Sequence, residues 1–185
     1  MTDDPLRARM LAAHHLENSE EIHDHGDVLV YLGGYKGLPI AIFSAGSEDS
    51  DNLLYTRDLN AAEIVYIGQC ASTTSRHGLR SVILAAGGSD SLLRRATAAA
   101  ARFDIPATVR TVLPPGAAQP EDGCIVDGIT GQFYEQSGIG GFEALSILTV
   151  SRDEAGGQIM EEHEVRSRFY AAARLAFETL TYSLT

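Results

Sequence analysis

The sequence has only two cysteines and no long apolar run, and each of these shortages excludes a class of protein. Cys70 and Cys124 are too few for the disulfide framework of a small secreted domain, and they lack the spacing of a zinc site. No apolar stretch approaches the length of a membrane span, and the first residues lack the basic and apolar regions of a signal peptide. We therefore expect a cytoplasmic protein with reduced cysteines and no membrane partner.

Basic residues are scarce as well. Lysine and arginine together number 14 against 25 aspartates and glutamates, which gives a formal net charge of -11. A protein that binds nucleic acid needs a basic face to neutralise phosphates, so we expect no nucleic-acid partner. What the chain does have is enough apolar material, 44% of 185 residues, for the core of one soluble domain. We expect a single domain over residues 1–185.

Short apolar runs organise the chain. The central run, 63–70, is rich in β-branched and aromatic residues and is interrupted by a glycine, and similar runs occupy 38–43 and 145–151. These runs predict buried strands of one α/β sheet, in which ligands bind at the carboxyl ends of the strands. Tyr66, Gln69 and Cys70 are therefore the first candidates for a site.

Helix and turn signals lie before and between these apolar runs. Asp4 before Pro5 predicts the start of a helix over 5–16, and a glycine-rich turn between strands 28–32 and 38–43 predicts a hairpin. The acidic segment 17–27 is expected to be a connector. The other expected elements are strands over 80–85, 107–113 and 124–127, and helices over 49–59, 91–103, 129–136 and 161–180.

Several short segments resemble one known family. They are Asp-Pro-Leu-Arg-Ala at 4–8, Gly-Tyr-Lys-Gly-Leu-Pro-Ile at 34–40, Ile-Gly-Gln-Cys at 67–70 and Thr-Val-Ser at 149–151. In this order they resemble the bacterial purine nucleoside phosphorylases, part of the nucleoside phosphorylase family. The resemblance implies a mixed central sheet that is partly closed into a barrel and flanked by helices, and it implies a homo-oligomer. Against the family, the first strand and a long segment between Gly88 and Ser91 are missing.

The resemblance also assigns the phosphate site. Phosphorolysis of a nucleoside requires donors for phosphate, a carboxylate for the ribose and an acid for the departing base. Arg7 matches a phosphate-binding arginine of the family. The position of the second phosphate arginine holds Tyr66, however, and that of the phosphate-binding serine holds Gln69, beside Cys70. The phosphate ligands are thus largely replaced.

The ribose and base positions are changed too. By resemblance, Asp127 keeps one family carboxylate, but Ile129 stands where the ribose-binding glutamate should be. Arg152 stands at the position of the base-protonating aspartate, and Asp153 follows it. Loss of a hydrogen-bond partner for a buried polar group costs about 1–3 kcal/mol, and a guanidinium offers no proton to a leaving base. We expect ordinary phosphorolysis to be lost.

These replacements predict a repurposed enzyme for a small, fairly apolar metabolite, such as a cyclase or isomerase of secondary metabolism. Arg152, Asp153 and Asp127 are its expected catalytic residues, without a cofactor, and Arg152 should point into the pocket and be held by a carboxylate. The expected ligand-binding residues are Arg7, Tyr66, Gln69, Cys70 and Ile129.

Three alternatives stay open: a nucleosidase or weak phosphorylase that uses Asp153 as its acid, a non-catalytic binding or interaction subunit, and a decayed enzyme that binds nothing in particular. No histidine is placed by sequence to activate Cys70 as a nucleophile. We expect no metal site, since the histidines near the N-terminus lack ligand spacing.

Overall fold

A computed structural model describes residues 1–25, 28–44, 60–74, 76–117, 125–167 and 169–182. By their contacts they form two compact units, Met1–Asn60 (the first unit) and Ala61–Thr185 (the second unit). The helix expected over 49–59 lies outside the described residues, as does Cys124. The expectation of a single domain stays a prediction.

The first unit consists of one helix and a three-stranded antiparallel sheet. Helix α1 (Pro5–His15) begins where the sequence predicts, because the Asp4 carboxylate accepts hydrogen bonds from the backbone N–H groups of Leu6 and Arg7. The sheet has the order β1 (Glu17–His25), β2 (Val28–Tyr35) and β3 (Leu38–Phe43). The expected hairpin of β2 and β3 is confirmed.

The expectation of a connector over 17–27 is wrong, because β1 is a strand that pairs with β2. Its described side chains, Glu17 to His23, are all exposed, and its register with β2 shifts twice. Charged residues are well suited to the edge of a sheet, where they discourage pairing with other chains. Because no face of β1 is buried, its sequence carries no alternation of apolar and polar residues that could reveal a strand.

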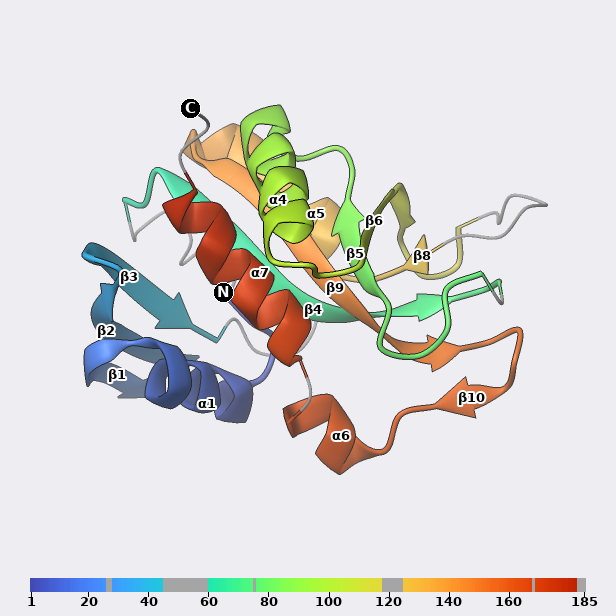
Figure 1. Cartoon of the computed structure of the whole chain (residues 1–185), viewed down its shortest axis with the longest axis horizontal. Coiled ribbons are helices and arrows are strands. Elements are labelled where there is room, and N and C mark those ends of the chain that lie inside the picture. Colours follow the sequence, from blue (N-terminus) through green and yellow to red (C-terminus); the bar gives the residue numbers. More distant parts are fainter. Residues whose placement is uncertain (26–27, 45–59, 75, 118–124, 168, 183–185) are drawn as a thin grey trace. The chain divides into compact units, whose positions relative to one another are not determined.

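The second unit is built on a mixed sheet of seven strands (Figure 1). The two long strands are β4 (Glu63–Ser72) and β9 (Glu143–Asp153), which run parallel through ten paired positions. The sheet has the order β6-β5-β9-β4-β8-β7, with β10 added beside β9, and the short strands are β5 (Val82–Ala85), β6 (Ala107–Arg110), β7 (Val112–Leu113), β8 (Ile125–Val126) and β10 (Gln158–Ile159).

One short segment of the chain supplies the strands at both edges of this sheet. Strands β6 and β7 are separated by Thr111 alone, yet β6 pairs with β5 at one end of the sheet and β7 pairs with β8 at the other. The strand expected over 107–113 is therefore divided between two partners. This division closes the sheet partly into a barrel, as the family resemblance implies.

Helices cover both faces of the sheet. Glu63 and Tyr66 point to opposite faces of β4, since they are three residues apart in a strand. Glu63 forms an ion pair with Arg95 of α4 (Asp90–Arg102), whereas Tyr66 packs against Phe133 of α5 (Thr130–Gly140). Helix α7 (Tyr170–Thr181) packs beside α4, and Figure 1 shows these two helices on one side of the sheet and α5 on the other.

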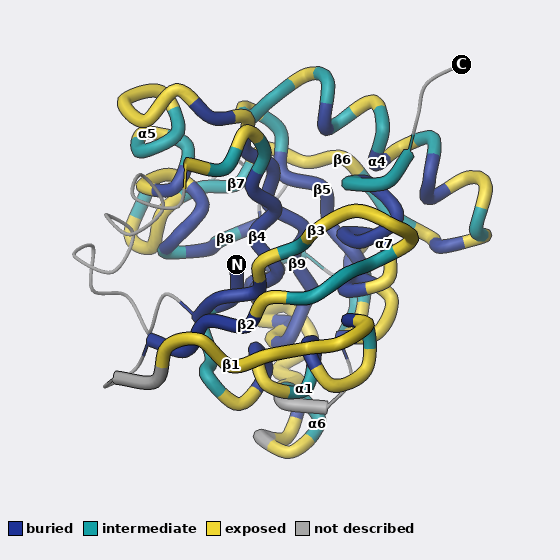
Figure 2. The backbone as a smooth tube through the Cα atoms, turned by 90° about the vertical axis from the view of Figure 1, so that its left-hand side faces the viewer, coloured by how far each residue is buried: buried dark blue, intermediate teal, exposed yellow. Residues whose placement is uncertain are grey.

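The single helix expected over 161–180 is two helices, α6 (Glu162–Ser167) and α7. Phe169, which lies between them, is buried. The spacing of apolar residues did not reveal the break, because the apolar residues of both helices follow the same helical spacing. Figure 2 shows where the core lies: the tube of β9 and β4 is almost continuously buried, while β1 is exposed.

Candidate functional site

The carboxyl ends of β4 and β9 lie side by side, as expected for parallel strands. Gln69 pairs with Thr149 and Ala71 pairs with Arg152, with an irregularity after Cys70. Strand β8 joins the same edge through Ala71 and Val126, so Asp127 follows directly. We call this edge the strand-end site and define it by Gln69, Cys70, Asp127 and Arg152.

Tyr66 lies deeper than the strand-end site. Its side chain is completely buried, and its ring lies across Gly68 of the same strand. A Cβ atom on Gly68 would lie 2.3 Å from both Cζ and Oη of Tyr66, so only glycine leaves room for the ring. Tyr66 is therefore part of the packed interior.

Aromatic rings surround Tyr66 on the α5 side of the sheet. Its ring centroid lies 6.1 Å from that of Phe133, which in turn lies 6.0 Å from that of Phe142. The hydroxyl of Tyr134 donates to the carbonyl of Ala85 at 2.8 Å and accepts from the N–H of Ser146 at 3.0 Å. Phe133 and Tyr134 fall in the helix expected over 129–136, but no motif in the sequence marks them or Phe142 as site residues.

The carboxylate of Asp127 is fixed by the start of α5. Its Oδ2 atom accepts hydrogen bonds from the N–H groups of Thr130 at 2.7 Å and Ile129 at 3.3 Å. Asp127 is 9% exposed and Ile129 is 8% exposed, so the carboxylate satisfies backbone donors that would otherwise be buried. Asp127 therefore stabilises the beginning of this helix.

Cys70 is buried, and nothing around it lowers the pKa of its thiol. Burial raises the pKa of this thiol, and the nearby negative charge of Asp127 raises it further. Since the thiolate is the nucleophile, the protonated thiol of Cys70 does not provide one near neutral pH. This agrees with the sequence analysis, in which no histidine is placed to activate it.

The carboxylate expected to hold Arg152 is not found among the described residues. Arg152 is exposed and forms no ion pair with the described residues. Its neighbour Asp153 is 7% exposed and its Oδ1 atom accepts from the N–H of Gly156 at 2.9 Å, in the turn between β9 and β10. Because neighbouring strand residues point to opposite sides, Asp153 turns inward and Arg152 turns toward water.

Two other expected ligand-binding residues differ in their surroundings. Gln69 is exposed at the end of β4. Arg7 belongs to the first unit, where it is buried, forms an ion pair with Asp3 and donates to Thr2 Oγ1 at 3.2 Å. Arg7 thus has partners within its own unit, and its role in binding stays a prediction.

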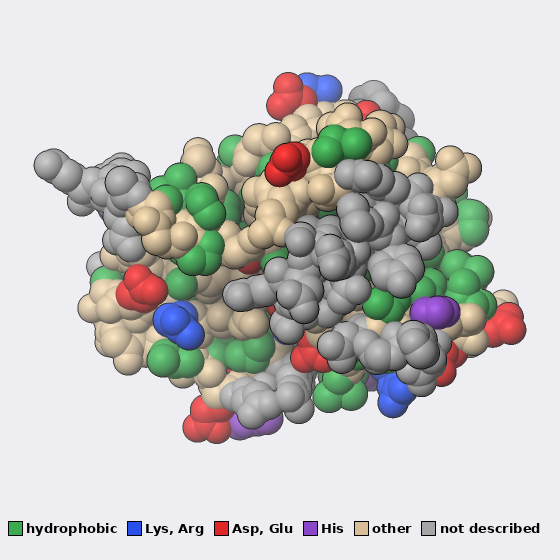
Figure 3. All heavy atoms as spheres, turned by 180° about the vertical axis from the view of Figure 1, so that it is seen from behind, with side chains coloured by type: hydrophobic (Ala, Val, Ile, Leu, Met, Phe, Trp, Pro, Cys, Tyr) green, Lys and Arg blue, Asp and Glu red, His purple; other side chains and the backbone are tan. Residues whose placement is uncertain are grey.

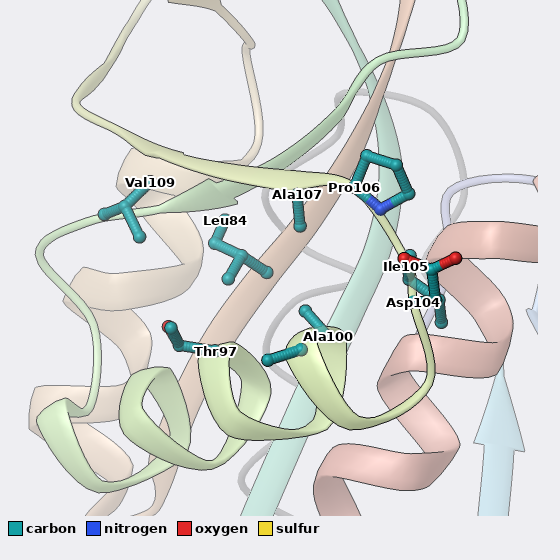
Figure 4. Close-up of a pocket in the computed structure, with 9 residues that line it drawn as sticks. Leu84, Thr97, Ala100, Asp104, Ile105, Pro106, Ala107 and Val109 are labelled. Carbon is teal, nitrogen blue, oxygen red and sulfur yellow. The ribbon is translucent and has the colours of Figure 1, made fainter.

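A separate hollow lies between α4 and the strands β5 and β6 (Figure 4). Its volume is about 440 Å³, and its walls are mainly apolar. In Figure 4 the side chains of Leu84, Ala100 and Ala107 point toward the same space, with Asp104 at one end. Such a volume suits a small molecule, but none of the expected site residues lines the hollow.

The described residues meet neither the requirements of a metal site built from three or more ligands nor those of a membrane-spanning helix. Among the described residues, no group of three or more His, Cys, Asp and Glu side chains is placed to hold a metal ion. No helix in the described ranges is long and apolar enough to cross a membrane. On the face shown in Figure 3, the visible basic side chains are scattered singly.

Comparison with known proteins finds similar enzymes. No protein-family model matches the chain. The purine nucleoside phosphorylase DeoD-type of Tolumonas auensis is 27% identical over 215 residues, which cover 97% of this chain and 91% of the relative. The enzyme of the same name from Buchnera aphidicola subsp. Acyrthosiphon pisum (strain Tuc7) is 28% identical, with 97% and 92% covered. A third, from Buchnera aphidicola subsp. Baizongia pistaciae, is 34% identical, but only 51% of this chain and 42% of the relative are covered.

The fold agrees with these relatives. A crystal structure of purine nucleoside phosphorylase from Toxoplasma gondii, in complex with immucillin-H, superposes with a TM-score of 0.81. The superposition covers 96% of this chain and 87% of that one at 13% sequence identity. In sequence the chain is similar over nearly its whole length to DeoD-type purine nucleoside phosphorylases, and its fold is that of a purine nucleoside phosphorylase. The expected fold class, a mixed α/β fold of this family, is confirmed.

This chain is shorter than its relatives within the aligned region. The alignments run over 215 positions, more than the 185 residues of this chain, so the relatives contain residues within the aligned region that this chain lacks.

Proposed function

We propose that this member of the nucleoside phosphorylase family is an enzyme that has lost phosphorolysis and acts on a small, largely apolar metabolite. The observation that carries this proposal is the burial of Tyr66 across Gly68. A guanidinium at this position would offer charged donors to phosphate, whereas a phenol packed against Phe133 offers phosphate neither charge nor space.

The other replaced positions support the same direction. Ile129 is apolar and 8% exposed, so a ribose at this position would lose a carboxylate partner for its hydroxyls, at about 1–3 kcal/mol for each unsatisfied group. Arg152 carries a guanidinium, which stays charged and cannot protonate a departing base. A neutral, mainly apolar ligand has no ribose hydroxyls to leave unsatisfied and no departing base to protonate.

The distribution of polar groups favours a reaction that depends on orientation. Asp127 and Asp153 both accept hydrogen bonds from the backbone, so their carboxylates hold the structure. Gln69 and Arg152 are the exposed polar side chains at the strand ends, and they are available to bind and position a ligand. Cyclisation and isomerisation draw much of their acceleration from holding one reactive conformation, which fits such a site.

The first test is release of base from inosine, adenosine and uridine, each measured with and without inorganic phosphate. We expect no turnover above background in either series, because the phosphate and ribose partners are replaced. A curated DeoD-type relative serves as the positive control. Phosphate-dependent release by this chain would overturn the proposal.

The second test locates the site with indole, used as a neutral aromatic probe, by NMR of backbone amides. The proposal expects saturable shifts at Cys70 and Ile129 of the strand-end region. Shifts confined to Leu84 and Ala100 would place binding in the separate hollow and count against the proposed site.

A second candidate function is a nucleosidase or weak phosphorylase. It is favoured by the names of the relatives and by the retention of Arg7 at a phosphate-binding position. Base release from inosine without phosphate would select the nucleosidase. The third candidate, a non-catalytic subunit, is favoured by the exposure of Arg152, and it predicts neither turnover nor saturable binding of the probe.

A further inference from the structure

His77 and Arg110 are bonded to each other in the second unit although they are 33 residues apart in sequence. Arg110 is the last residue of β6, and its Nε atom donates to His77 Nε2 at 3.0 Å. His77 belongs to the turn between β4 and β5, in which its own N–H donates to the carbonyl of Thr74. This bond joins the turn to an edge strand of the sheet.

The bond determines which nitrogen of His77 carries the proton. A guanidinium only donates hydrogen bonds, so Nε2 of His77 accepts and the proton of the neutral ring lies on Nδ1. Burial lowers the pKa of His77, and the positive charges of Arg110 and Arg76 lower it further. Near neutral pH the imidazole is therefore neutral, and Nδ1–H is a donor.

The three neighbouring side chains present donors and positive charge to a solute. Arg76 and Arg110 are exposed, and neither forms an ion pair with a described residue. Elsewhere in the second unit, Arg80 is paired with Glu164 at 2.6 Å and Arg95 with Glu63 at 2.5 Å. In a chain with a formal net charge of -11, two arginines that lie beside a buried imidazole and pair with no carboxylate of the described residues are an unusual arrangement.

An anion would complete this arrangement. The planar guanidinium group matches phosphate and carboxylate oxygens, and hydrogen bonds between charged partners are stronger than neutral ones. An anion would also offset the positive charge that two guanidinium groups impose on His77. We propose that Arg76, His77 and Arg110 bind the phosphate or carboxylate group of a small-molecule ligand.

This anion site is separate from the strand-end site. It uses the β4–β5 turn and the end of β6, and it contains none of the residues expected from the family resemblance. Its test is therefore independent of the test for phosphorolysis. The proposal can hold whether or not the chain acts on nucleosides.

The test is an NMR titration of the His77 ring with inorganic phosphate and, separately, acetate, each against sodium chloride at equal ionic strength. We expect saturable shifts of the His77 resonances and a raised His77 pKa, because the bound anion stabilises the imidazolium. Saturation by phosphate alone assigns a phosphate group as the ligand, and saturation by acetate assigns a carboxylate. Shifts that follow ionic strength and do not saturate overturn the proposal.

Variants separate binding from a structural role of the bond. We expect Arg110→Gln and Arg76→Gln each to weaken binding of the saturating anion about tenfold, the loss of one charge-assisted contact. Arg76 makes no side-chain hydrogen bond with a described residue, so Arg76→Gln should leave the turn intact even if Arg110→Gln disturbs it. The control is Arg102→Gln, because Arg102 lies near the rings of Phe103 and Tyr182. If Arg76→Gln and Arg102→Gln lower the affinity for the anion equally, the proposal is overturned.

Discussion

At the scale of single residues, Gly68 and Tyr66 share one closely packed space on β4. A side chain at residue 68 and the Tyr66 ring cannot occupy the same space, so the glycine and the tyrosine depend on each other. The family segment Ile67 to Cys70 retains its glycine, but here the space beside it holds an aromatic ring.

This dependence gives the first stability prediction. Gly68→Ala should lower the free energy of unfolding by about 1–3 kcal/mol, because the new Cβ overpacks a closed interior. The control is Gly34→Ala, where no atom lies closer than 3.9 Å. Urea unfolding measures both.

A double-mutant cycle with Tyr66→Leu tests the cause. If the ring is the obstacle, Gly68→Ala should cost clearly less in the Tyr66→Leu background. Equal costs in the two backgrounds would show that the Tyr66 ring is not what excludes a side chain at residue 68.

Cys70 gives a prediction about reactivity. In a Cys124→Ser background at pH 7, we expect native Cys70 to react with iodoacetamide at least about tenfold more slowly than the same thiol in unfolded protein, because burial raises its pKa. Mass spectrometry of the alkylated protein measures both rates. Rapid alkylation of the native form would restore Cys70 as a candidate nucleophile.

At the scale of elements, α5 begins at the strand-end site and is held there by Asp127. Asp127→Ala should lower the free energy of unfolding by about 0.5–2 kcal/mol, since two backbone N–H groups lose their acceptor. Glu135→Ala is the control, because Glu135 is exposed on the same helix and should change stability by less than about 0.5 kcal/mol. If the two variants are equally stable, Asp127 does not cap α5.

At the scale of the whole molecule, we expect a symmetric homo-oligomer, dimer or larger, by resemblance to the family. Ile139 and Ile159 are 61% and 66% exposed in the second unit, and self-association is one way to cover such side chains. Light scattering at micromolar concentration measures the assembly. A monomer under these conditions would contradict the expectation. In that case Ile139→Lys and Ile159→Lys should leave the molecular mass in solution unchanged.

Where a local pattern is strong, the sequence by itself determined the element. The apolar runs at 63–70 and 145–151 became β4 and β9, and Asp4 with Pro5 marked the start of α1. The family segments also predicted the mixed, partly closed sheet. These features are local because periodicity, capping and short motifs involve residues that are close in sequence.

Tertiary structure alone decided which groups are available for chemistry. The sequence placed Asp127, Asp153 and Arg152 near one edge, but only the fold shows that both carboxylates bind backbone donors while Arg152 is exposed. Likewise, β1 is a strand because β2 supplies its hydrogen-bond partners. The physical reason is that burial and hydrogen bonding depend on which distant segments meet, and no local pattern contains that information.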